Sequence, residues 1–159
     1  RFFLPVAGGV DVAQIEKHLA NSSVAVTLTH DARYALMGIA RAAIAASGTV
    51  VMEAAIMGLP AVVLYRMSAL SYLVGRLLVD VPRFSLPNIL VGETFETELL
   101  QNAVQPERIA EAMERIIMDG APRDYVTERL ARAVALLGEP HAARRVAEKI
   151  LALGKHCDY

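Results

Sequence analysis

The stretch Arg41–Arg66, RAAIAASGTVVMEAAIMGLPAVVLYR, decides the fold of this 159-residue chain. It contains two short apolar runs, Ala42–Ala46 and Ala61–Tyr65, separated by a turn, a helical stretch over Val50–Met57 and a Gly-Leu-Pro stop. Continuous apolar strands that alternate with helices are typical of a parallel sheet covered by helices on both faces. The stretch therefore predicts an α/β protein with a strand–helix–strand unit at its centre.

A turn made of Ser47, Gly48 and Thr49 joins the first of these strands to the helix. In open parallel sheets, ligands bind beyond the carboxyl ends of the strands and beside the amino ends of the helices. Gly48 would let a ligand approach the backbone closely, and the two hydroxyl groups would lie beside unpaired helix amides. We therefore expect a binding site at this turn.

Glu53 is the one charged residue in a helix that is otherwise apolar on all sides. A buried carboxylate needs a partner, because an unpaired buried charge is costly. A capping box would require Ser or Thr three residues earlier, where the chain has Val50, and Thr49 is four residues away. Two interpretations stay open, a structural hydrogen bond to a neighbouring loop or a contact with the two hydroxyl groups of a ribose.

These residues belong to a longer pattern. Residues 46–66 read ASGT-x3-EA-x3-G-x-P-x-VV-x-YR, and SLPNIL follows at 85–90 and ELLQ at 98–101. At this spacing the chain closely resembles the carboxyl-terminal half of lipid-A-disaccharide synthases, bacterial glycosyltransferases with two Rossmann-like domains. The resemblance runs from the FFLPVA strand to about Leu153. It implies a Rossmann-like parallel sheet with helices on both faces, followed by C-terminal helices, as in one half of a type-B glycosyltransferase.

The resemblance also implies an activity. These enzymes join UDP-2,3-diacylglucosamine to 2,3-diacylglucosamine 1-phosphate and release UDP, in lipopolysaccharide synthesis and without a cofactor. This chain would bind the UDP-sugar donor, while an amino-terminal domain would receive the acylated glucosamine phosphate acceptor and supply the general base. In the family a Leu-Pro-Gly-Ser-Arg phosphate loop precedes the equivalent of Arg1, so we expect the true N-terminus upstream and residues 1–159 alone to be inactive. A homodimer and peripheral attachment to the cytoplasmic membrane face are further expectations.

The resemblance assigns roles to particular residues. The turn would contact the diphosphate or the nearby sugar, Glu53 the ribose, and Arg66 the phosphate charge. Asn88, in SLPN, would orient the donor sugar or phosphate, although its residue type alone favours an Asx turn. A short helix expected over Glu96–Gln101 would lie near the donor phosphates. The full set of expected donor-binding residues is Ser47, Gly48, Thr49, Glu53, Arg66, Asn88, Glu98 and Gln101.

Composition limits the alternatives. The chain is 55% hydrophobic and 21% charged, which indicates a packed globular protein rather than a disordered one. Its formal net charge of −1 offers no general attraction to nucleic acid. Cys157 is the single cysteine, which excludes an internal disulfide and favours a reducing, cytoplasmic location. No apolar run approaches the roughly 20 residues of a membrane span, and the four histidines lack metal-ligand spacing.

The remaining pattern predicts the order βαβαβαβ and therefore a parallel sheet with right-handed crossovers. Strands are expected at Phe2–Ala7 and Val24–Leu28, and helices over about 12–20 and 31–39. A helix from Ser68 to about Leu78 is apolar enough to be either core or a face against lipid. Residues 81–92 are expected to be a connecting segment.

Three further helices are expected over about 106–118, 124–136 and 141–153. We therefore divide the chain into a nucleotide-sugar-binding core at 1–105, C-terminal helices at 106–153 packed on it, and a flexible tail at 154–159. Arg41 departs from the family, in which Asp is more frequent at that position. Two other functions remain alternatives, a UDP-N-acetylglucosamine 2-epimerase-like enzyme and a non-catalytic nucleotide-binding module.

Overall fold

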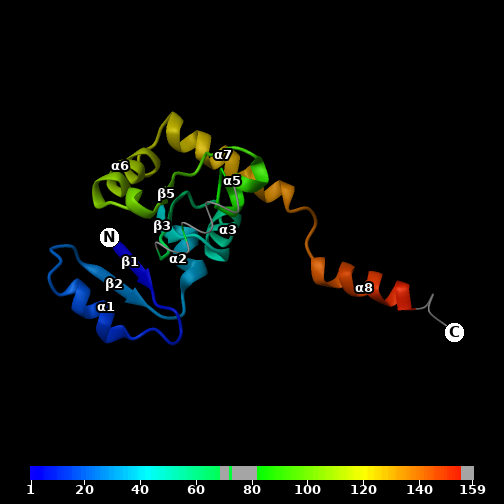
Figure 1. The fold of residues 1–159 in the computed structure, drawn as a ribbon, viewed down its shortest axis with the longest axis horizontal. Coiled ribbons are helices and arrows are strands. Elements are labelled where there is room, and N and C mark those ends of the chain that lie inside the picture. The colour runs from blue at the N-terminus through cyan, green and yellow to red at the C-terminus, as the bar shows by residue number, and fades with distance from the viewer. Residues whose placement is uncertain (69–71, 73–81, 155–159) are drawn as a thin grey trace.

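A computed structural model describes residues 1–68, 72 and 82–154, and it confirms the α/β class (Figure 1). All strand pairs in this part of the chain are parallel. The strands are β1 (Phe2–Pro5), β2 (Val26–Thr29), β3 (Ala43–Ala46), β4 (Ala61–Tyr65) and β5 (Glu98–Leu100). The helices are α1 (Val12–Leu19), α2 (Arg33–Ile39), α3 (Thr49–Ile56), α5 (Leu86–Val91), α6 (Pro106–Ile117), α7 (Ala121–Leu136) and α8 (Ala142–Gly154), with a 3-10 turn, η1, at Gln101–Ala103.

The described strands form two sheets, β1-β2 and β3-β4-β5. β4 is the central strand of the second sheet, with Ala43 opposite Ala61 on one side and Val63 opposite Glu98 on the other. The apolar run FFLPVA is the pattern of a buried strand, but the side chains of β1 are exposed, 57% for Phe2 and 45% for Phe3. The apolar pattern of β1 thus predicts the strand correctly and its burial wrongly, because β2 is the only strand in the described part of the chain that pairs with it.

The core lies around β4. Val62 and Val63 have no exposed surface, and α3 packs Val51 and Ala55 against the same region. α7 adds Leu130, which is also fully buried. Full burial of such a side chain stabilises the fold by about 1.5–3 kcal/mol. The strand–helix–strand unit at 42–65 is therefore the centre of the packed body, as the sequence predicts.

Two local predictions are wrong. Residues 98–100 form β5 rather than part of a helix, because the Val63 N–H donates to the Thr97 carbonyl at 2.8 Å and draws the segment into the sheet. The connecting segment contains α5, which begins after Ser85, tolerates Pro87 in its first turn and ends at Gly92, whose φ of 77° suits glycine. The helix expected from Ser68 to about Leu78 lies almost wholly outside the described residues, as does the tail at 155–159.

Arginine side chains hold the carboxyl end of α6. Arg41 Nε donates to the Ile117 carbonyl at 2.7 Å and its guanidinium pairs with Asp119. Arg123 donates to the carbonyl of Ile116 and, at 2.8 Å, to the carbonyl of Arg41. The last carbonyls of a helix have no partner within the helix, so these contacts satisfy them and complement the helix dipole. Arg41 therefore has a structural role that joins α6 to β3.

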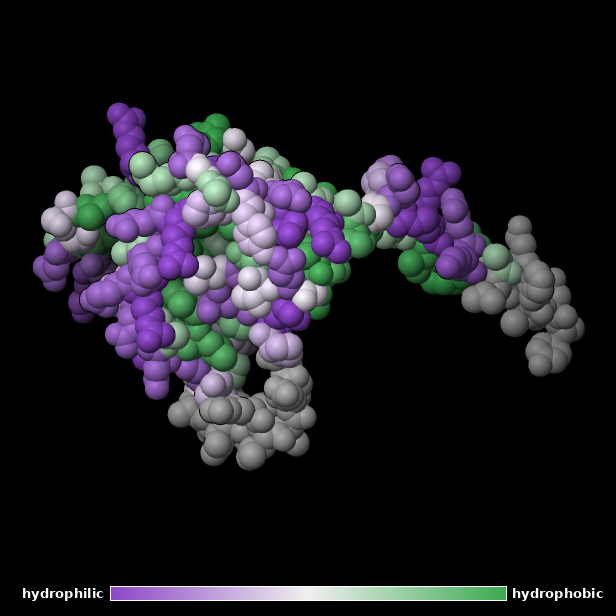
Figure 2. All heavy atoms as spheres, turned by 90° about the horizontal axis from the view of Figure 1, so that it is seen from above, coloured by the Kyte–Doolittle hydropathy of each residue, from purple (hydrophilic) through white to green (hydrophobic). Residues whose placement is uncertain are grey.

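α8 extends away from the packed body (Figure 1). Figure 2 shows its surface as mainly hydrophilic with hydrophobic atoms along one side. The exposed apolar side chains on this helix are Val146, Ile150 and Leu151. None of the helices in the described ranges is both long and apolar enough to cross a bilayer.

Glu96 is a carboxyl group buried in this core. It is 1% exposed, its Oε1 accepts the Ala61 N–H at 3.2 Å, and its Oε2 has no hydrogen-bond partner among the described residues. Burial raises the pKa of Glu96 to about 8, the Ala61 hydrogen bond opposes this, and the nearby Glu98 charge adds to it. The folded chain therefore favours the protonated form of Glu96.

We predict that Glu96→Gln reduces the dependence of stability on pH. The pKa is about 8 when folded and 4.5 ordinarily, so the folded chain binds more protons between these values. The free energy of folding that Glu96 contributes is complete below pH 4.5 and is lost as pH rises through 8. Its size is about 1.4 kcal/mol for each unit by which the folded and ordinary pKa values differ. Denaturant unfolding at a series of pH values measures the slope. The exposed substitution Glu114→Gln is the control, and equal slopes for both variants would contradict the assignment.

Candidate functional site at the carboxyl edge of β3 and β4

The Ser47–Thr49 turn lies where β3 ends and α3 begins. The Ser47 N–H donates to the Leu64 carbonyl at 2.8 Å, which fixes the turn at the carboxyl ends of both strands. Gly48 precedes the first residue of α3, and a Cβ atom built on it would meet no atom within 4 Å. Thr49 is exposed. The turn therefore leaves open space beside Gly48 and an exposed Thr49 hydroxyl at the amino end of α3, which suits the approach of an anion.

Residues 84–88, which include the whole SLPN string, lie beside this turn. Ser47 Oγ donates to the Phe84 carbonyl at 3.3 Å, and the rings of Tyr65 and Phe84 are 5.9 Å apart. These contacts join the ends of β3 and β4 to the amino end of α5. The structure thus brings together two of the sequence motifs that carry the family resemblance.

Asn88 is fully buried at this junction. Its Oδ1 accepts the N–H groups of Phe95 and Glu96, both at 3.0 Å. Its Nδ2 donates to the Glu96 carbonyl at 2.9 Å and to Glu98 Oε1 at 2.7 Å. Both hydrogens and both lone-pair directions of the amide are therefore engaged within the chain. This geometry differs from the Asx turn that its residue type suggested and leaves the amide no group for a ligand.

Glu98 is engaged in the same way. Its Oε2 accepts the Phe84 N–H at 3.0 Å, and its Oε1 accepts the Ser85 N–H at 2.9 Å in addition to the Asn88 amide. A carboxylate that accepts backbone amides makes charge-assisted hydrogen bonds, which are stronger than neutral ones. Glu98 and Asn88 together hold residues 84–88 against β5.

Gln101 and Arg66 lie just beyond β5 and β4. Gln101 Oε1 accepts the Met67 N–H at 2.9 Å, and its Nε2 donates to the Met67 carbonyl at 3.1 Å. Its side chain therefore continues the sheet pairing after Tyr65 and fixes the backbone that carries Arg66. The Arg66 side chain is exposed, and no described residue pairs with it.

Glu53 lies one turn along α3 from Thr49. Its side chain is 24% exposed and pairs with Arg33 of α2 at 3.4 Å. Within the described ranges neither of its oxygens accepts a hydrogen bond, and Oε2 is enclosed. The sequence analysis did not single out Arg33. The position of Arg33 at the start of the helix that follows β2 could have indicated it, because that is the edge where such sheets bind ligands.

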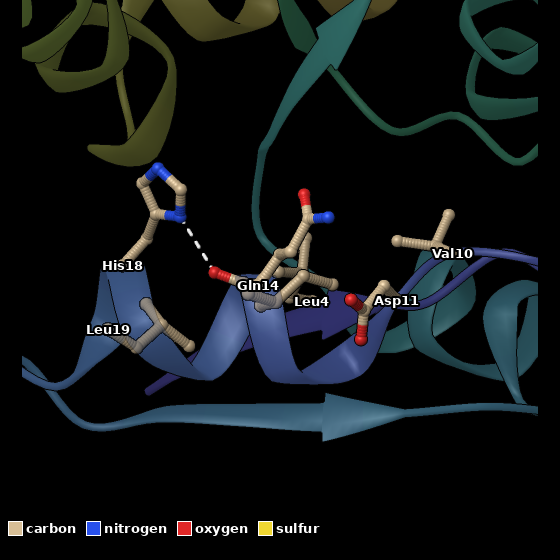
Figure 3. A pocket seen from close by; sticks show the side chains of 7 residues that line it. Leu4, Val10, Asp11, Gln14, His18 and Leu19 are labelled. Carbon is tan, nitrogen blue, oxygen red and sulfur yellow. Dashed lines mark hydrogen bonds between the residues drawn. The ribbon is translucent and has the colours of Figure 1, made fainter.

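A separate hollow lies on α1 and β1, lined by residues including Leu4, Val10, Gln14 and His18 (Figure 3). It measures about 330 Å³ and is open to solvent. His18 Nδ1 lies 2.7 Å from the Gln14 carbonyl of its own helix. None of the expected donor-binding residues lines this hollow. Among the residues that the structure describes, no group of three or more acidic, His or Cys side chains could hold a metal ion.

The comparison with protein families decides the identity. The family model described as Lipid-A-disaccharide synthetase matches residues 2–151. The chain belongs to this family. This chain is 41% identical over 150 residues to a lipid-A-disaccharide synthase of Myxococcus xanthus. The matched region covers 94% of this chain and 39% of that protein.

Other relatives give the same result. A lipid-A-disaccharide synthase of Syntrophus aciditrophicus is 38% identical over 99% of this chain and 42% of its own length. One from Anaeromyxobacter dehalogenans is 40% identical over 96% of this chain and 40% of its own length. The chain thus spans about two-fifths of the length of the curated relatives it matches.

We predict that Asn88→Asp lowers the free energy of unfolding of this chain. The new carboxylate would lose both donated hydrogen bonds and face the Glu98 carboxylate where Nδ2 now lies 2.7 Å away. Like charges about 4 Å apart repel by on the order of 4 kcal/mol at an effective dielectric of 20. Denaturant unfolding should show a loss of that size.

The double substitution Asn88→Asp with Glu98→Gln tests the cause. It restores a donor opposite an acceptor between these two side chains, so it should recover part of the lost stability. If Asn88→Asp unfolds at the unchanged denaturant concentration, the buried hydrogen bonds of Asn88 are not the constraint described here.

Proposed function

We propose that this chain is the UDP-sugar-binding half of a hexosyltransferase that joins UDP-2,3-diacylglucosamine to 2,3-diacylglucosamine 1-phosphate. The products would be lipid A disaccharide 1-phosphate and UDP. One observation supports the proposal above others. The open Ser47–Thr49 turn and the Glu53 carboxylate, which accepts no hydrogen bond from a described residue, occur at the carboxyl edge of a parallel sheet in a chain of this family.

The proposed donor site has two groups of residues. The Ser47–Thr49 turn would meet the diphosphate or the adjoining sugar, and Arg66 would neutralise phosphate charge. Glu53 would accept the two ribose hydroxyl groups. Asn88, Glu98 and Gln101 would act indirectly, because their polar atoms already bind the backbone around the site. We therefore assign these three to positioning of the SLPN turn and of Arg66.

The proposed chemistry is stabilisation of a leaving diphosphate. Transfer to the acceptor hydroxyl breaks the bond between the anomeric carbon and the diphosphate, and oriented N–H groups and cations favour the charge that develops. Inversion at the anomeric carbon requires the acceptor to approach from the opposite face. We propose that the acceptor site and the general base lie in the part of the full-length protein outside residues 1–159.

The acylated substrates suggest where the protein works. We propose that the full-length protein attaches peripherally to the cytoplasmic face of the inner membrane, where both lipids could reach it. The exposed apolar side of α8 could serve a homodimer or the rest of the same protein. The proposed membrane attachment rests on the chemistry of the substrates, and the proposed interface on α8 rests on its exposed apolar area.

The test is transfer by the full-length protein, with UDP release and disaccharide formation measured from the two lipid substrates. We predict that Glu53→Gln weakens UDP binding by about 10- to 100-fold without changing the melting temperature, because hydrogen bonds to a charged group contribute about 1.5–3 kcal/mol. The exposed substitution Glu111→Gln on α6 is the control. A lowered melting temperature with unchanged UDP affinity would make Glu53 a structural residue instead.

A further inference from the structure

The carboxylates of Glu98 and Glu53, near the carboxyl edge of the sheet, differ in how many hydrogen bonds they can still accept from a ligand. Glu98 accepts three hydrogen bonds from the chain, so its lone pairs are largely used. Glu53 accepts none from any described residue. A carboxylate oxygen can accept about two hydrogen bonds, and because Oε2 is enclosed, Oε1 is the oxygen that remains for a ligand.

A carboxylate in this position still requires a compensating charge. Glu53 lies on a helix whose neighbouring residues Met52 and Ala54 are buried, and its own side chain is only 24% exposed. Removing a charge from water without a partner costs several kcal/mol. The structure supplies one cation among the described residues, the Arg33 guanidinium, 3.4 Å from Glu53 Oε2.

Arg33 is itself held in place from a second side. Its Nη2 donates to the Tyr34 hydroxyl at 2.8 Å, and the centre of its guanidinium lies 4.7 Å from the centre of the Tyr34 ring. These contacts orient the guanidinium, which contributes charge to Glu53 without forming a hydrogen bond to it. Oε2, the oxygen that pairs with Arg33, is enclosed, while the Glu53 side chain as a whole stays partly exposed. A ligand can therefore approach the carboxylate from its open side.

We propose that Arg33 is a positioning residue for a vicinal diol of the ligand. Its guanidinium pairs with Oε2 and offsets the desolvation of the carboxylate, so that Oε1 on the open side accepts both hydroxyl groups. The proposal rests on the proposed function, in which this diol is the ribose of UDP. Arg33 would act through Glu53 and would make no contact with the nucleotide.

The experiment is titration calorimetry on the full-length protein with UDP and with 2′,3′-dideoxy-UDP, which lacks both hydroxyl groups. The quantity measured is the ratio of the two affinities. Arg33→Gln should lower this ratio by about tenfold through the affinity for UDP alone, and Arg33→Lys should restore part of it because the charge returns. In a Glu53→Gln background, Arg33→Gln should have no further effect.

The control is Arg115→Gln, which removes an arginine from another pair at 3.4 Å, with Glu111 on the exposed surface of α6. It should leave the affinity ratio unchanged. If Glu53→Gln leaves the ratio unchanged, the ribose assignment fails. If Glu53→Gln lowers it and Arg33→Gln does not, only the role of Arg33 is overturned. An equal loss of both affinities in Arg33→Gln would instead indicate contact with the diphosphate, which also overturns the positioning role.

Discussion

The buried amide of Asn88 is the constraint on which the candidate site depends. It accepts two backbone N–H groups and donates to a carbonyl and to Glu98, and Glu98 in turn binds the amides of Phe84 and Ser85. The Phe84 carbonyl then receives Ser47 Oγ. An unbroken chain of hydrogen bonds therefore connects the core to the turn that precedes α3. Because an unsatisfied buried polar group costs about 1–3 kcal/mol, this network constrains residues 84–88 to one arrangement.

Separate carboxylates in this small domain have separate roles because their surroundings differ. Glu98 accepts three hydrogen bonds and positions the backbone of residues 84–85, whereas Glu53 pairs with Arg33 and accepts no hydrogen bond from a described residue. Burial of Glu96, whose Oε2 has no hydrogen-bond partner among the described residues, raises its pKa to about 8. Charge, hydrogen bonding and desolvation are the three causes of such differences. Residue type alone does not distinguish these roles.

The sequence predicts the parts of this structure that depend on local pattern. β4, α3 and the intervening turn follow from an apolar run, a Gly-containing corner and a helix, all within residues 42–65. β5 could not be predicted in this way, because Glu98–Leu100 becomes a strand only by pairing with β4, about 35 positions earlier in the chain. The partners of Asn88 likewise meet only after β5 has joined the sheet. Arg33 reaches Glu53 from a different helix, so no spacing rule places them together.

The position of Glu96 shows why a raised pKa does not by itself mark a catalytic group. Perturbed pKa values are enriched at functional sites, so Glu96 would be a natural candidate for an acid or base. However, its Oε1 binds the N–H of Ala61, the first residue of β4, whereas the candidate site lies beyond Tyr65, the last residue of that strand. Open parallel sheets bind ligands at the carboxyl ends of their strands. Glu96 therefore lies at the opposite end of β4 from the candidate site, and we expect its protonation to affect stability rather than proton transfer.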